Sequence, residues 1–96
     1  MKRDAIVLKE ADNVATALRD LSRNKVALVG IGEKTLMVRL VDTVEFGHKF
    51  AVGDIQAGDD IIKYGEVIGR ATAAIPVGAH AHVQNIESLR GRGDLA

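Results

Sequence analysis

The chain has 96 residues, of which 47% are hydrophobic, and its 13 basic residues balance its 13 acidic residues. This length fits one domain, residues 1–96, with a single modest core. Neutral charge and an aromatic content of only 3% argue against a surface for nucleic acid or an anionic membrane, because such surfaces are basic and nucleic-acid sites often stack aromatic rings.

The sequence contains no cysteine, which excludes disulfide bonds and thiolate chemistry. Residues 1–9 lack the apolar run of a signal peptide, and no window approaches the length that spans a bilayer. We therefore expect a soluble cytoplasmic domain without a membrane partner.

The first elements expected are a strand over residues 5–9 and then a helix. Asp12 or Asn13 can cap a helix that ends near Asn24. Its apolar face would consist of four residues at the i, i+3, i+4, i+7 spacing, namely Val14, Ala17, Leu18 and Leu21. The pattern predicts one short α-helix near the N-terminus.

From residue 25 the pattern favours short strands instead. They are expected over residues 26–30, 36–41, 50–52, 61–64, 67–71 and 80–83. Gly65-Glu66 is the expected hairpin turn between two of them. Residues 86–96 are interpreted as a polar tail or a link to a larger partner. The sequence thus predicts a mainly β domain with one helix.

Residues 29–35, VGIGEKT, superficially suit a nucleotide site. A phosphate-binding loop needs glycine where Glu33 stands, and the dinucleotide motif needs a third glycine where Thr35 stands. A hairpin turn is the better interpretation.

Residues 47–85 hold all three histidines and the only tyrosine. His80 and His82 are two apart on a predicted strand and should share a face, with Gln84 next in the row. Imidazole binds divalent metals and transfers protons near neutral pH. The alternative is a row of half-exposed polar residues on an edge strand, and the spacing leaves both open.

Two further pairs are equally ambiguous. His48 and Lys49 can hold a carboxylate, with lysine as a point charge and histidine as donor or base. Lys63 and Tyr64 can face a polyol. Each pair can also be an ordinary solvated turn.

Five blocks in this order carry a resemblance: DNVAT (12–16), GHKFAVGDI (47–55), GDDIIKYGEVIGRAT (58–72), GAHAHVQN (78–85) and SLRGRGD (88–94). Together they resemble the SAF domain of the altronate/galactarate dehydratase family, whose relatives include the small subunit of sulfolactate sulfo-lyase. The resemblance implies a β-clip fold. It also implies a metal-dependent lyase that removes water from a sugar acid such as altronate or galactarate, giving a 2-keto-3-deoxy acid.

The resemblance also implies roles for residues. His48 and His82 would be catalytic, and His80 with His82 would contact a metal, Fe²⁺ or alternatively Mn²⁺. Substrate contacts would come from Lys49, Lys63, Tyr64, Asn85 and Arg90. A larger catalytic partner, which could hold most of the metal, is expected to be needed for activity; a homo-oligomer is also compatible with the sequence.

One position departs from the family pattern, which resembles V-H-V-H-N where this chain has AHVQN over residues 81–85. Gln84 replaces the second histidine, and His80 adds an imidazole two residues before His82. Glutamine is the poorer ligand for a transition metal. His80 can compensate, or the site can be partly lost, or the substrate can differ. The alternatives are a sulfolactate sulfo-lyase small subunit, or a non-catalytic module that binds polyhydroxy acids or a protein partner.

Overall fold

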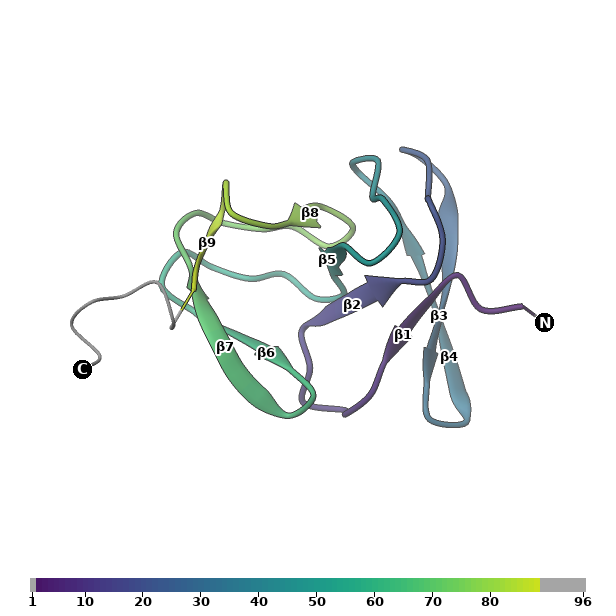
Figure 1. Cartoon of the computed structure of the whole chain (residues 1–96), viewed down its shortest axis with the longest axis horizontal. Coiled ribbons are helices and arrows are strands. Elements are labelled where there is room, and N and C mark those ends of the chain that lie inside the picture. Colours follow the sequence, from purple (N-terminus) through teal and green to yellow (C-terminus); the bar gives the residue numbers. More distant parts are fainter. Residues whose placement is uncertain (1, 89–96) are drawn as a thin grey trace.

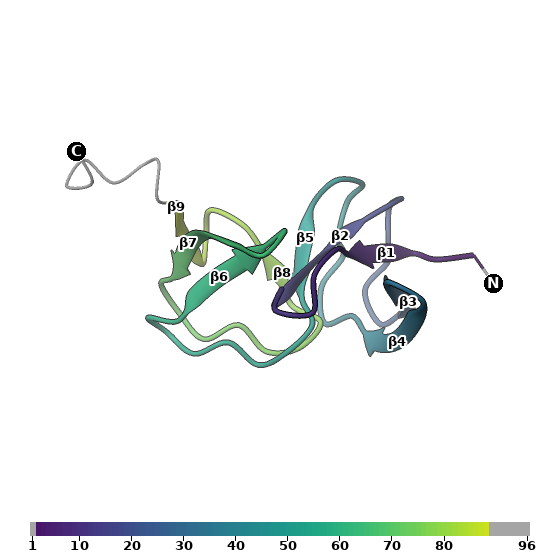
Figure 2. The same cartoon turned by 90° about the horizontal axis from the view of Figure 1, so that it is seen from below.

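The structure is a computed structural model that describes residues 2–88 and shows no helix among them. Nine strands are present: β1 (Ala5–Val7), β2 (Val14–Ala17), β3 (Val26–Ile31), β4 (Lys34–Arg39), β5 (Lys49–Ala51), β6 (Asp60–Lys63), β7 (Glu66–Ala71), β8 (His80–Ala81) and β9 (Ile86–Ser88). Six form a sheet in the order β4-β3-β1-β2-β5-β8, and three form a second sheet, β6-β7-β9. The two sheets lie next to each other along the long axis (Figures 1 and 2). The prediction of a mainly β domain is confirmed.

The predicted N-terminal helix is wrong. Val14–Ala17 form β2, which pairs antiparallel with β1 on one side and with β5 on the other. Hydrogen bonding to two neighbouring strands outweighs a modest local preference for helix. Asn24 does adopt a left-handed conformation, with φ of 73°, but it lies in the turn before β3 and does not end a helix.

Two hydrophobic cores lie on opposite sides of β2 and β5. The first includes Leu21, Leu40, Val44 and Phe50; the second includes Val14, Ile55, Ile61, Ile75 and Ala51. Successive residues of a strand point to opposite faces, so Phe50 enters the first core and Ala51 the second. Lys49, two residues before Ala51, therefore points toward the second core and the second sheet.

Asp12 connects the two sheets instead of capping a helix. Its buried carboxylate accepts hydrogen bonds from the backbone N–H groups of Tyr64 and Gly65, at 3.0 and 2.8 Å. Tyr64 and Gly65 have φ of 57° and 74°, the left-handed values that a two-residue hairpin turn requires. The turn between β6 and β7 is thus Tyr64-Gly65, one residue earlier than the predicted Gly65-Glu66.

The final predicted strand, residues 80–83, is shorter than expected. β8 covers only His80–Ala81, and a turn over residues 82–85 leads into β9. β9 pairs with β7, so residues 86–88 of the predicted polar tail belong to the second sheet. Residues 89–96, including Arg90, lie outside the described part of the chain.

Candidate functional site

The three histidines come together from two distant segments. β5 pairs with β8, with Phe50 opposite His80, and this pairing brings the residue before β5 next to the β8 edge. The ring centroid of His48 lies 5.2 Å from that of His80 and 5.0 Å from that of His82, and His80 and His82 are 5.7 Å apart. His48 Nδ1 and His80 Nε2 are 3.0 Å apart, within hydrogen-bond distance.

Gln84 determines which nitrogen of His80 carries a proton. Its amide nitrogen lies 3.3 Å from the His80 carbonyl oxygen and 3.2 Å from His80 Nδ1. Because an amide nitrogen only donates, His80 Nδ1 accepts and the proton of neutral His80 is on Nε2. His80 Nε2–H then donates to His48 Nδ1. Burial, and next the neighbouring His48 and His82, lower the pKa of His80, which favours the neutral form that this arrangement needs.

Along β8 and the turn that follows it, side chains form the hydrogen bonds to the backbone that a neighbouring strand would otherwise form. Asp42 Oδ2 accepts a hydrogen bond from the His80 N–H at 2.9 Å. Asn85 Oδ1 accepts from the His82 N–H at 2.9 Å, and Asn85 Nδ2 donates to the His80 carbonyl oxygen at 2.9 Å. The Asn85 amide, for which the resemblance implies a substrate contact, thus holds the turn that carries the histidines.

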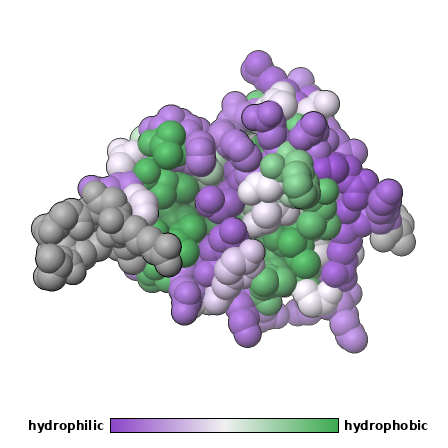
Figure 3. All heavy atoms as spheres, viewed as in Figure 1, coloured by the Kyte–Doolittle hydropathy of each residue, from purple (hydrophilic) through white to green (hydrophobic). Residues whose placement is uncertain are grey.

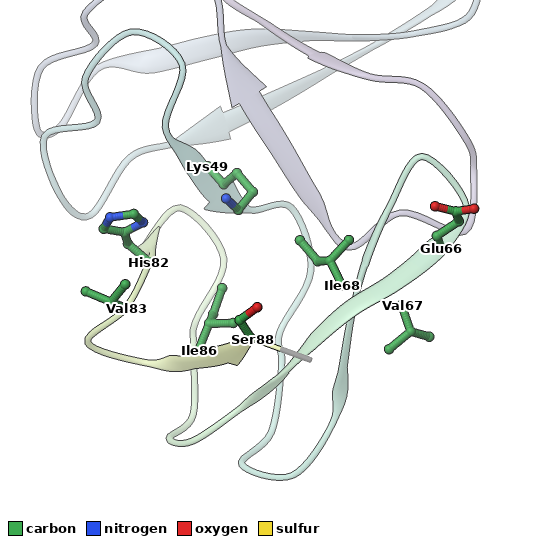
Figure 4. A pocket seen from close by; sticks show the side chains of 8 residues that line it. All are labelled: Lys49, Glu66, Val67, Ile68, His82, Val83, Ile86 and Ser88. Carbon is green, nitrogen blue, oxygen red and sulfur yellow. The ribbon is translucent and has the colours of Figure 1, made fainter. Parts of the chain in front are cut away.

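A pocket of about 560 Å³ opens beside the histidines, and its lining comes from β5, the β8–β9 turn, β7 and β9: Lys49, Glu66, Val67, Ile68, His82, Val83, Ile86 and Ser88. Lys49 extends between the His82–Val83 turn and Ile68 of β7 (Figure 4). Burial, and then the charge of Lys63, lower the pKa of Lys49. A partly desolvated ammonium group in a pocket with an imidazole can bind a carboxylate.

Lys63 and Tyr64 lie at the β6–β7 turn and do not line this pocket. The Lys63 Nζ atom is 4.7 Å from the centroid of the Tyr64 ring, a cation–π distance. Tyr64 is 49% exposed. Of the two, Lys63 is connected to the pocket through its electrostatic effect on Lys49.

The histidines do not form a metal site by themselves. Within residues 2–88, no three His, Cys, Asp or Glu side chains are placed to hold a metal ion. Both ring nitrogens of His80 and Nδ1 of His48 already have hydrogen-bond partners, so an ion there would displace them. The predicted pair, His80 and His82, also lacks the carboxylate that commonly completes a site for iron or manganese.

Sequence reasoning missed Asp42 and the aliphatic wall of the pocket. Asp42 is 38 residues from His80, and no local pattern predicts that contact. Val67, Ile68 and Ile86 are ordinary strand residues in the sequence. Val83 offered a weak signal, because it is an aliphatic residue inside the polar stretch His82–Asn85.

The chain is similar to known proteins of one family. Residues 3–89 match the family described as the altronate/galactarate dehydratase SAF domain. The chain is 42% identical over 80 residues to altronate dehydratase of Escherichia coli (strain K12), which is 83% of this chain and 15% of that protein. It is 38% identical over 74 residues to galactarate dehydratase (L-threo-forming) of the same organism, which is 77% of this chain and 13% of that protein.

A second kind of relative is closer in size. The chain is 36% identical over 58 residues to (2R)-sulfolactate sulfo-lyase subunit alpha of Chromohalobacter salexigens, which is 60% of this chain and 62% of that subunit. It therefore covers most of a small subunit but only a minor part of the long dehydratases. From the extent of the family match, the chain belongs to the SAF domain family of the altronate/galactarate dehydratases.

Proposed function

We propose that this chain is the SAF part of a cytoplasmic dehydratase that removes water from a hexonate or hexarate, such as altronate or galactarate, to give a 2-keto-3-deoxy acid. The observation that carries the proposal is the cluster of His48, His80 and His82, of which His82 lines a pocket that also contains Lys49. The names of the relatives, altronate dehydratase and galactarate dehydratase, support this substrate class.

The reaction needs a base that removes the proton α to the carboxylate and an acid that protonates the departing β-hydroxyl. The resulting enol rearranges to the 2-keto-3-deoxy acid. Lys49 would bind the carboxylate and offset the negative charge that develops on it. His48 and His82 are the proton carriers. Because His48 Nδ1 accepts from His80, His48 would exchange protons through Nε2.

The family resemblance also implies a divalent metal, Fe²⁺ or Mn²⁺, which would act as a Lewis acid on the substrate. Since the described histidines do not complete a metal site, we assign the ion mainly to a larger catalytic partner. An open pocket beside an exposed His82 also needs a cover to exclude water. The chain alone is therefore expected to be inactive.

The size of the chain favours a second candidate, a sulfolactate sulfo-lyase. The chain covers 62% and 70% of two proteins named subunit alpha of that enzyme, and this name implies a further subunit. The chemistry would again begin with removal of an α-proton, but sulfite would leave in place of water.

The proposal is tested by combining the chain with a larger catalytic chain of the family and Fe²⁺. Altronate, galactarate and sulfolactate are assayed in parallel for 2-keto-3-deoxy acid or sulfite. His48→Ala and His82→Ala should each lower kcat by roughly 100-fold or more, the usual contribution of a general acid or base. Lys34→Ala, at the distant β3–β4 turn, is the matched control.

Three outcomes are distinguishable in this experiment. Loss of turnover with an intact complex supports catalysis by the histidines. Full turnover in both histidine variants contradicts it. Loss of assembly with no change in turnover per complex would instead identify a non-catalytic module. The replacement of a histidine by Gln84 favours that alternative.

A further inference from the structure

Two strongly exposed hydrophobic side chains lie next to the clustered histidines in the sequence. Val83 is 80% exposed and follows His82 directly, and Phe46 is 67% exposed and lies two residues before His48. Among the large hydrophobic residues of the described chain, only Met37, at 70%, is comparably exposed. Met37 lies on β4, at the opposite edge of the six-stranded sheet. Isolated exposed hydrophobic residues are common, so a functional interpretation needs a further observation.

The pocket provides this observation. Val83 lines it together with Val67, Ile68 and Ile86, and Figure 3 shows a column of hydrophobic atoms over β7 and β9. The part of the pocket at Lys49 and His82 suits the polar substrate, whose hydroxyl groups need hydrogen-bond partners, whereas the aliphatic wall suits an aliphatic side chain. Val83 belongs to both features and so joins the exposed residues beside the histidines to the pocket wall, whereas Phe46 does not line the pocket.

Charge adds a second requirement on what covers this surface. Lys63 lies close enough to Lys49 to lower the pKa of Lys49 electrostatically. No ion pair of either lysine is found within residues 2–88, where the ion pairs involve other cations. One carboxylate, that of the substrate, is assigned to Lys49. Lys63 lies over the Tyr64 ring and opposite Glu66 in the β6–β7 register, and its ammonium group can pair with a further acidic group once water is excluded.

We propose that Phe46, Val83 and the aliphatic pocket wall form the docking surface for the larger catalytic part of the enzyme, which seats an apolar segment there and places an acidic side chain opposite Lys63. This inference rests on the proposed function, because it presupposes that larger part. The size difference supports it, since the matched region is only 15% of altronate dehydratase. Docking at this surface also covers the histidines and Lys49, which excludes water from the reacting groups.

The test measures binding of this chain to E. coli altronate dehydratase from which the 80 matching residues have been removed. Phe46→Asp and Val83→Asp are compared with Met37→Asp, a control of similar exposure on β4. Each docking variant should weaken binding by roughly tenfold or more, as expected for apolar anchors of an interface, whereas the control should change it less than about twofold. Circular dichroism and thermal unfolding establish that all three variants fold.

A charge variant and an assay complete the design. Lys63→Glu should also weaken binding, and added salt should weaken the wild-type complex but have less effect on this variant. Wild-type affinity in Phe46→Asp and Val83→Asp, equal weakening by Met37→Asp, or no wild-type complex would each overturn the inference. So would concentration-dependent dimerisation of the chain alone that both docking variants abolish, because a second copy would then cover the surface.

Turnover separates this inference from the proposed function. A complex that is sensitive to Val83→Asp but inactive on every substrate supports the docking surface and contradicts the dehydratase. Full turnover by Val83→Asp at low enzyme concentration supports the dehydratase and contradicts the docking surface.

Discussion

The two edges of the six-stranded sheet are held together in different ways. At one edge, β3 and β4 pair in a regular ladder of six residues each, from Val26 opposite Arg39 to Ile31 opposite Lys34. At the other edge, β8 has two residues. Hydrogen bonds between the backbone there and the side chains of Asp42, Gln84 and Asn85 take the place of a further strand.

The β8 edge, where the histidines gather, therefore depends more on individual side chains than the β4 edge does. A regular ladder is held by many backbone hydrogen bonds, so it depends little on any single side chain. Side-chain partners bind individual peptide groups, and at β8 they hold the segment in a short strand and turn that bring His80 and His82 against His48. Such an edge depends on a few groups from distant segments, so single substitutions should affect it more than the β4 edge.

The largest contrast is expected from two glycines. Gly78 has φ of 87°, and a Cβ there would overlap the Arg39 carbonyl oxygen, whereas Gly32, at the β3–β4 turn, has φ of 58° and open space. Gly78→Ala should lower the free energy of unfolding by about 3 kcal/mol or more, and Gly32→Ala by about 1 kcal/mol, the cost of a left-handed alanine alone. Chemical denaturation measures both, and equal losses would contradict the close approach of the segment before β8 to Arg39.

A smaller contrast is expected from the polar groups. Asp42→Ala leaves the His80 N–H without its partner and should cost about 1–2 kcal/mol, whereas Thr35→Ala on β4 should cost less than about 0.5 kcal/mol. Asp42→Asn, which keeps an acceptor oxygen, should recover most of the loss. Thermal and chemical unfolding of the three variants give the comparison. A fully stable Asp42→Ala would show that this hydrogen bond does not hold the β8 edge.

The smallest expected effect is a dependence of stability on pH. The folded pKa of His80 is lowered, mainly by burial, so the unfolded chain binds a proton more readily than the folded chain does. The contribution of neutral His80 is therefore complete above the unfolded pKa of about 6.5 and is lost as the pH falls through the folded pKa. His80→Gln should show a shallower decline in stability between neutral and mildly acidic pH. An identical decline would assign the effect to other groups.

The sequence by itself determined the mainly β class and the family, and it pointed to the segment that carries the candidate site. Short apolar runs separated by glycine turns are local signals, because a turn such as Tyr64-Gly65 needs only its own backbone preferences. The five family blocks were likewise legible without a structure. His48, Lys49 and His82 could also be chosen as candidates from the sequence, because imidazole and ammonium groups have the same chemistry wherever the fold places them.

Only the tertiary structure decided which strand each residue meets and which side it faces. Residues 14–17 have helical spacing, yet pairing with β1 and β5 makes them a strand. The contact of His48 with His80 spans 32 residues, and Gln84, expected to share a strand face with His80, reaches it through a turn. Lys49 faces the pocket because Phe50 fills the first core. These outcomes depend on distant partners. Their hydrogen bonds and packing outweigh the local preferences for helix or strand, which are a few tenths of a kcal/mol per residue.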